Sequence, residues 1–483
     1  MDSKLVPARV FEFFAQINQI PRPSKHEERM IEYLKNFGES RGLRTVVDET
    51  GNVLISKPAT PGYEDRPTVI LQSHMDMVCD KLVDVDFDFS TDAIQTYIDG
   101  EWMHAKGTTL GADDGIGDAM ELALLDDDTV EHGPIECVFT RDEETELTGA
   151  RGIKPGFMTG SYLINLDSED EGQIFVSCAG GHSTTARFAF APEAAPEGYE
   201  FVEISLKGLN GGHSGDDINK KRANAIKLLA RYLYKEIKAG VDLRISSFNS
   251  GKMDNAIPRD GKVVIAAPAA AIAQLKADWQ AHERDAKTEF HCTDTTMQFF
   301  FNPTQAAPVV PAQVGQNLVR ALQAVDNGVF AMSQEQELSW LVETSTNLSI
   351  VRTLEGCIEV VTLQRSSVNS NLENIANTVT AAFELAGATC TGADSNPAWP
   401  MKEHSQLQAI AEKTYTELFG HAPKVLGIHA GLECGLFALR YPDLDMISMG
   451  PTLRNVHTPD ECLHIPTVKM VWDHLCAILK NIK

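Results

Sequence analysis

The sequence predicts an α/β protein of two domains, one of which interrupts the other. Strand and helix patterns alternate over residues 1–182, change in length and periodicity over residues 183–397, and return to the first style over residues 398–483. The chain has 483 residues, too many for one ordinary hydrophobic core. We therefore expect a discontinuous first domain with a second domain inserted into it.

In the first segment, Ser24 followed by Glu27 is typical of a capping box, which predicts a helix to about Gly38. The stretch DETGNVLIS indicates a turn that leads into a strand, and a second helix is expected over residues 114–125. Buried strands are expected at VILQSHMDM, IECVFT and YLINL. This alternation predicts a mostly parallel mixed sheet flanked by helices.

The inserted segment repeats a longer pattern. The strand EFVEISLKGL precedes the helical KRANAIKLLARYLYKEI, and the strand CIEVVTLQRS precedes the helical NLENIANTVTAAFELAG. This order predicts an α/β domain of two similar halves. After SNPAWP, the first domain is completed by helices over residues 402–418 and from Thr467 onward, and by strands at KVLGI and LDMISMG.

Composition and charge narrow the class of protein. A formal net charge of −26 argues against nucleic acid or an anionic membrane as a partner. No stretch approaches the roughly 20 apolar residues that span a bilayer, and the N-terminal residues lack the features of a signal peptide. The nine cysteines form no CxxC pair. We therefore expect a cytoplasmic protein with reduced thiols.

Histidine and acidic residues occur in five separate places, four of them where an apolar run ends. In an open α/β sheet the carboxyl ends of the strands are where ligands bind. Two imidazoles with several carboxylates and few thiolates are the ligand set expected for a pair of hydrolytic zinc ions. The residues are His74 and Asp76 in QSHMDMV, Asp113 in GTTLGADDGIG, Glu143 and Glu144 in TRDEETEL, Asp167 in INLDSED, and His457 in NVHTPDE.

These motifs, together with IPRPSKHEE, GGHSG, NAIPR, IHAGLECGLF and HTPDE, resemble the di-zinc family of aminopeptidases, carboxypeptidases and aminoacylases over nearly the whole chain. The resemblance implies a di-zinc catalytic domain that carries an inserted lid domain. It also implies a zinc-dependent dipeptidase that hydrolyses Xaa-His dipeptides, with β-alanyl-histidine as a candidate substrate.

By this resemblance, one zinc ion takes His74 and Asp167, the other takes Glu144 and His457, and Asp113 is shared by both. Asp114 beside Asp113 competes for the bridging role, and the motif alignment favours Asp113. Cobalt or manganese could replace zinc at such a site.

The two remaining acids receive other tasks. His74 and Asp76 lie two apart on a predicted strand and therefore point to the same side. The resemblance makes Asp76 the residue that orients the His74 imidazole. Glu143 becomes the general base for the water that bridges the metals.

In the inserted domain, the glycine-rich turn GLNGGHSG carries His213, to which the resemblance assigns stabilisation of the oxyanion. Asn255 and Arg259 of NAIPR and Arg365 of LQRS are polar groups able to hold the substrate carboxylate, and the resemblance favours Arg365 of the two arginines. In HAGLE, Gly431 is expected to lie against the substrate, and Glu433 is a weaker candidate contact.

Three alternatives stay open at this point. Another amidohydrolase of the family, such as an N-acyl amino acid deacylase or a tripeptidase, would share the same metal site. A non-catalytic zinc-binding or peptide-binding relative would keep the fold, but it would have no need for a base such as Glu143. The sequence also leaves open a homodimer, in which His213 would act in its own chain or across the subunit interface.

Overall fold

The computed structural model describes residues 5–336, 338–393 and 395–483. The chain divides into two compact units, each with its own core of buried apolar side chains. Unit 1 contains residues up to Ser177 together with Trp399–Gly427 and Leu432–Lys483. Unit 2 contains Cys178–Ala398 and the four residues Ile428–Gly431. Within unit 2 the Ala179 N–H donates to the carbonyl oxygens of residues 428 and 430, each at 3.0 Å.

Unit 1 is built on a mixed sheet whose central strands are parallel. β6, β3, β7 and β21 run parallel, whereas β1, β2 and β8 pair antiparallel with their neighbours. Every residue of β3 and β6 is buried, as expected for parallel strands covered on both faces. The predicted mixed sheet is therefore confirmed. Its strand order is β1 (Arg44–Val47), β2 (Val53–Lys57), β6 (Ile135–Thr140), β3 (Val69–His74), β7 (Tyr162–Asn165), β21 (Asp445–Ser448), β8 (Gln173–Cys178) and β20 (Lys424–Ile428).

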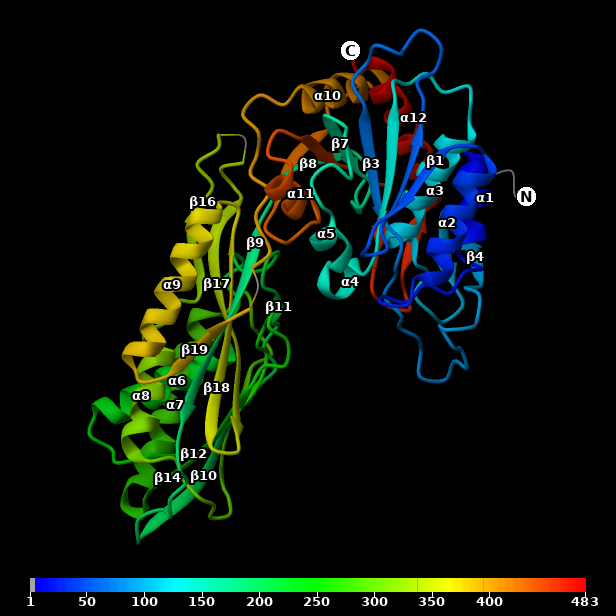
Figure 1. The fold of residues 1–483 in the computed structure, drawn as a ribbon. Helices are drawn as coiled ribbons and strands as arrows, with labels where there is room; N and C mark the ends of the chain where they lie inside the picture. The colour runs from blue at the N-terminus through cyan, green and yellow to red at the C-terminus, as the bar shows by residue number, and fades with distance from the viewer. Residues whose placement is uncertain (1–4, 337, 394) are drawn as a thin grey trace. The chain divides into compact units, whose positions relative to one another are not determined.

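Helices of unit 1 cover this sheet. α3 packs on β3 and α1 packs on α3, while α2 contacts β1 and β2 (Figure 1). α10 contacts β21 and α12. The helices are α1 (Ala8–Ile17), α2 (Glu28–Ser40), α3 (Ala112–Asp126), α4 (Glu143–Glu146), α5 (Thr148–Gly152), α10 (Gln406–Phe419), α11 (Cys434–Arg440) and α12 (Ile465–Asn481). A small antiparallel sheet consists of β22 (Leu453–Arg454), β23 (Cys462–His464), β5 (Trp102–Ala105) and β4 (Thr96–Asp99).

The capping box predicted at Ser24 and Glu27 is wrong. α2 begins at Glu28, and Glu27 at its N-cap makes no side-chain capping bond. The Ser24 hydroxyl instead donates to Asp76 Oδ2 at 2.7 Å, and the Glu27 carboxylate accepts the N–H of Asp142 at 3.1 Å. Both side chains therefore bind segments that are distant in sequence. Buried carboxylates in those segments require hydrogen-bond donors more strongly than the exposed end of the helix requires acceptors.

Unit 2 is built on an antiparallel sheet with helices along one side (Figure 1). The expected pairs are both present: β10 with α6, and β18 with α9. They lie on opposite sides of the junction at which Ser250 of β12 pairs with Val351 of β17. The strand order is β15 (Gln298–Pro303), β10 (Tyr199–Lys207), β14 (Gly261–Pro268), β12 (Arg244–Ser250), β17 (Val342–Leu354), β18 (Cys357–Ser366), β9 (Gly180–Ala189) and β19 (Thr389–Gly392), and β16 (Gly328–Met332) pairs with β17.

The helices of unit 2 are α6 (Ala225–Lys238), α7 (Ile272–Glu289), α8 (Ala312–Ala324) and α9 (Asn369–Leu385). A short ladder of β11 (Gly212–His213) and β13 (Ala256–Ile257) lies outside the main sheet. Across the part of the chain that the structure describes, every helix is too short or too polar to span a membrane.

Acid should destabilise unit 1 through His474, which is buried between α12 and α10. Its Nε2–H donates to the carbonyl oxygen of Ala411 at 2.8 Å, and burial lowers the pKa of His474 to about 4. The unfolded chain, with a pKa of about 6.5, binds this proton first as pH falls, so stability is lost between about pH 6.5 and 4. Over this pH range we expect the free energy of unfolding of wild type to fall by up to about 3 kcal/mol relative to that of His474→Gln, measured by denaturant unfolding.

The matched control is His404→Gln, because the His404 side chain is 90% exposed. The difference between the free energies of unfolding of His404→Gln and wild type should not change over the same pH range. A difference between wild type and His474→Gln that stays constant from pH 7 to pH 4 would contradict the prediction.

Candidate metal centre

The first part of the centre forms where β3 and β7 end side by side. β3 ends at His74, which is buried, and Asp167 follows two residues after the end of β7. The Nε2 atom of His74 lies 3.1 Å from Asp113 Oδ1 and 3.7 Å from Asp167 Oδ1. Because β3 and β7 are parallel neighbours, their carboxyl ends meet at one edge of the sheet and bring the two side chains together.

Asp113 lies between two imidazoles at the start of α3. Its Oδ1 faces His74, and its Oδ2 lies 3.1 Å from Nε2 of His457. Its backbone is not helical, with φ −84° and ψ 108°. Asp114 has a different environment, since its carboxylate accepts the backbone N–H groups of His74 and Gly117. Of the two neighbouring acids, Asp113 is thus the one placed between the histidines.

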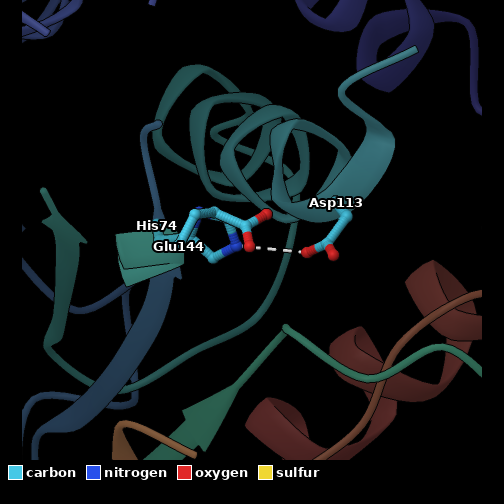
Figure 2. Close-up of side chains that lie close together, drawn as sticks. All are labelled: His74, Asp113 and Glu144. Carbon is cyan, nitrogen blue, oxygen red and sulfur yellow. Dashed lines mark hydrogen bonds and ion pairs between the residues drawn. The ribbon is translucent and has the colours of Figure 1, made fainter. Parts of the chain in front are cut away.

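Glu144 adds a carboxylate beside His457. Its Oε2 lies 3.0 Å from Nε2 of His457, whereas its Oε1 is buried and has no hydrogen-bond partner among the described residues. Figure 2 shows the side chains of His74, Asp113 and Glu144 directed toward one another from three separate segments of unit 1. One ligand atom from each of these three residues lies within 4.8 Å of the others, so the group can hold a metal ion.

The protonation of these groups reflects an excess of buried carboxylates. Hydrogen bonds to Asp113 and Glu144 raise the pKa of His457 to about 11. Burial alone would lower the pKa of His74, but the nearby Asp167, Asp113 and Asp76 raise it well above its usual value. Burial also raises the pKa of Asp167 well above its ordinary value. A positive charge would therefore stabilise the centre, and its nitrogen and oxygen donors fit a divalent cation.

Glu143 adjoins Glu144 at the start of α4, and burial raises its pKa well above its usual value. Asp76 fixes both residues, since its Oδ1 accepts the Glu143 N–H at 3.0 Å and its Oδ2 accepts the Glu144 N–H at 3.2 Å. Asp76 Oδ1 also lies 3.4 Å from Nδ1 of His74. Asp76 lies just beyond the end of β3, and it joins that strand end to α4.

Glu27, Asp76 and Asp142 form a second group of buried acids next to the start of α4. Its oxygens are already engaged: the Arg141 guanidinium donates to Glu27, and the hydroxyls of Thr145 and Thr148 donate to Asp142. Asp142 has a left-handed backbone with φ 52°, directly before Glu143. This group therefore shapes the turn that presents Glu143.

Two buried residues next to the centre were not singled out by reasoning from the sequence. Arg22 is buried and donates to the carbonyl oxygens of Met75, Asp76 and Gly111, so it ties the end of β3 to the loop before Asp113. Glu461 is buried against that same loop. Both belong to quoted motifs, IPRPSKHEE and HTPDE, which was the signal available.

The other predicted site residues, His213, Asn255, Arg365 and Gly431, all belong to unit 2. Arg365 is only 7% exposed; its Nη2 lies 3.4 Å from Nε2 of His213, and its Nε donates to the Ser214 hydroxyl. Asn255 and Gly431 are exposed, and the Asn255 carbonyl accepts the Ser214 N–H at 2.8 Å. His213 and Arg365 are thus brought together, with Asn255 joined to them through Ser214.

Glu433, named as a weaker candidate contact, belongs to unit 1 and is fully buried. Its Oε2 accepts hydrogen bonds from Gln72 Nε2 at 2.6 Å and from the Thr140 hydroxyl at 2.7 Å. Burial raises the pKa of Glu433 to about 7. The Glu433 carboxylate is therefore a buried group of unit 1 that is hydrogen-bonded to β3 and β6.

Comparison with known proteins gives consistent matches. The sequence profile of the peptidase family M20/M25/M40 matches residues 70–481. The cytosol non-specific dipeptidase of Escherichia coli K12 is 40% identical over 483 residues, which cover 99% of each chain. The crystal structure of aminoacylhistidine dipeptidase from Vibrio alginolyticus matches with a TM-score of 0.90 and 42% identity, covering 100% of this chain and 98% of that chain. An aminopeptidase from Bacillus cereus shares the fold at 16% identity and a TM-score of 0.57, covering 99% and 100% of the two chains.

Proposed function

The chain belongs to the peptidase family M20/M25/M40, and from this premise we propose that it is a zinc-dependent dipeptidase that hydrolyses Xaa-His dipeptides, β-alanyl-histidine among them. Two relatives that match nearly the whole chain support dipeptides as the substrate class: one is named a cytosol non-specific dipeptidase, the other an aminoacylhistidine dipeptidase. The name of the first relative also supports a cytoplasmic location for this chain.

The observation that carries the proposal is the position of Asp113, whose two oxygens each face a different imidazole at 3.1 Å. A carboxylate so placed suits two cations, one on each oxygen. We assign Asp167 with His74 to one zinc ion and Glu144 with His457 to the other. When bound, such ions supply a Lewis acid for the substrate carbonyl and lower the pKa of a water molecule. Cobalt and manganese prefer similar ligands and could occupy the same residues.

Glu143 is assigned the proton transfer. Its backbone is held by Asp76, and its carboxyl lies in a buried position that raises its affinity for a proton. A base of this kind takes a proton from the attacking water and passes it to the departing amine. Asp76 contacts both His74 and the Glu143 N–H, and it therefore fixes the position of the candidate ligand relative to the candidate base.

Recognition of the substrate is assigned to unit 2. Arg365 is buried beside His213 and the Ser214 hydroxyl. A buried guanidinium suits the carboxylate of a dipeptide, to which it can donate two parallel hydrogen bonds. We assign Asn255 to the same carboxylate, His213 beside Arg365 to the oxyanion, and Gly431 to the substrate backbone.

A substrate panel tests this proposal. Free dipeptides, acetylated amino acids and tripeptides are compared after removal of metal and readdition of zinc. We expect the dipeptides to have the highest kcat/KM, with β-alanyl-histidine and other Xaa-His dipeptides hydrolysed. Preferred cleavage of acetylated amino acids would indicate a deacylase, and preferred cleavage of tripeptides a tripeptidase. Zinc binding without turnover of any member would indicate a binding protein.

A further inference from the structure

Glu461 is a buried acid whose hydrogen-bond partners are four consecutive backbone N–H groups. It lies four residues after His457 and is 2% exposed. Its Oε2 accepts the N–H groups of Leu110 at 2.7 Å and Gly111 at 3.0 Å. Its Oε1 accepts those of Ala112 at 2.8 Å and Asp113 at 3.3 Å. Both oxygens of this side chain are therefore committed to one loop about 350 residues away in the sequence.

That loop leads into α3, whose regular turns begin after the non-helical Asp113 and Asp114, and Asp114 Oδ1 accepts the N–H of Gly117 at 3.2 Å. The N-cap residue is Gly111, with φ 66°, and the first N–H groups of a helix need acceptors from elsewhere. A Cβ at this glycine would lie 2.7 Å from Arg22 Nη2 and 2.8 Å from Met77 Sδ, so a larger residue would displace one of these side chains as well as strain the left-handed backbone. A negative charge at this end of the helix is also favoured by the helix dipole. Glu461 thus supplies the acceptors for the N–H groups of residues 110–113, which precede the regular turns of α3.

Glu461 connects the segments that carry Asp113 and His457, the two candidate ligands that lie 3.1 Å apart. Asp113 is the last residue of the capped loop, and His457 lies on the segment that carries Glu461. The Asp113 N–H points to Glu461, and the Asp113 backbone stays outside helical geometry. In this conformation Asp113 Oδ2 lies 3.1 Å from His457 Nε2.

We propose that Glu461 is a positioning residue of the metal centre: by binding the N–H groups of residues 110–113, it fixes the bridging carboxylate of Asp113 relative to His457. This inference rests on the proposed function, because it concerns the same two ions. Groups that orient metal ligands in this way typically contribute about 10- to 100-fold to metal affinity.

The test replaces Glu461 by glutamine, which keeps the size but turns an amide NH₂ toward two backbone N–H groups. The matched control is Asp445→Asn. Asp445, at the start of β21, is also a buried carboxylate, and its oxygens accept the Ser405 hydroxyl and the N–H groups of Gln406 and Leu407 at the start of α10. Metal-free proteins are titrated with zinc by calorimetry, and their melting temperatures are measured in parallel.

We expect Glu461→Gln to bind zinc about 10- to 100-fold more weakly at one site or both, and Asp445→Asn to bind it like wild type, although both melt earlier. Glu461→Asp, which keeps the carboxylate, should recover part of the affinity. Wild-type zinc affinity in Glu461→Gln, together with a lowered melting temperature, would show a purely structural cap and overturn the inference.

If Glu461→Gln does not fold, Glu461→Asp is compared with Asp445→Glu, since each changes the stem by one methylene. Weaker zinc binding by the first variant alone supports the inference, and equal binding by both overturns it. Failure of the proposed function would look different, because wild type itself would then bind no zinc or cleave no dipeptide.

Discussion

Removal of metal by exhaustive dialysis against a chelator is expected to abolish dipeptide hydrolysis, and added zinc is expected to restore it. Asp113 lies 3.1 Å from the imidazoles of both His74 and His457, and Glu144 lies 3.0 Å from that of His457, so these side chains need a cation to act on a substrate. The reaction then lacks both the Lewis acid and the acidified water. Activity is measured against metal content determined by elemental analysis.

The same experiment distinguishes the candidate metals. Cobalt and manganese are added in parallel with zinc, because the nitrogen and oxygen donors accept all three. Full activity in protein shown to contain no metal would contradict the assignment of the whole centre. Restoration at two equivalents of metal per chain, with little at one, would support the shared position of Asp113.

Alanine at Glu143 is expected to lower kcat by roughly 10²–10⁴-fold while both metal ions remain bound, the usual scale for a lost general base. Alanine at the adjacent Glu144 should instead lower the metal content, because its carboxylate lies 3.0 Å from His457 and has a second oxygen without a partner. Two neighbouring residues of one short helix thus give different losses, measured by steady-state kinetics and elemental analysis.

Glu146→Ala is the matched control within the same helix. Its carboxylate is exposed and pairs with Lys25, so we expect kcat and metal content to stay near the wild-type values. Loss of metal in Glu143→Ala, with metal retained and kcat lowered in Glu144→Ala, would show that the two roles are reversed.

The sequence by itself determined the elements and the candidate ligands. Continuous apolar runs such as VILQSH and IECVFT predict buried parallel strands, because a strand covered on both faces has no polar side. Parallel strands end at one edge, so polar residues that follow them, such as His74 and Asp167, can be expected to meet. The family resemblance then supplied the roles, which periodicity alone does not contain.

Apart from Asp76, which was expected beside His74, the groups that hold the candidate ligands in place were decided by the tertiary structure. Ser24 and Glu27 satisfy the local pattern of a capping box, yet their side chains bind Asp76 and the Asp142 turn. Glu461 binds the N–H groups of a loop that lies about 350 positions earlier in the sequence. Local patterns report hydrogen bonds between near neighbours in the sequence, whereas a buried carboxylate takes whichever donors the folded chain brings to it. The candidate ligands and Asp76 beside His74 could therefore be expected from the sequence and its resemblance, whereas the supporting contacts of Ser24, Glu27 and Glu461 could not.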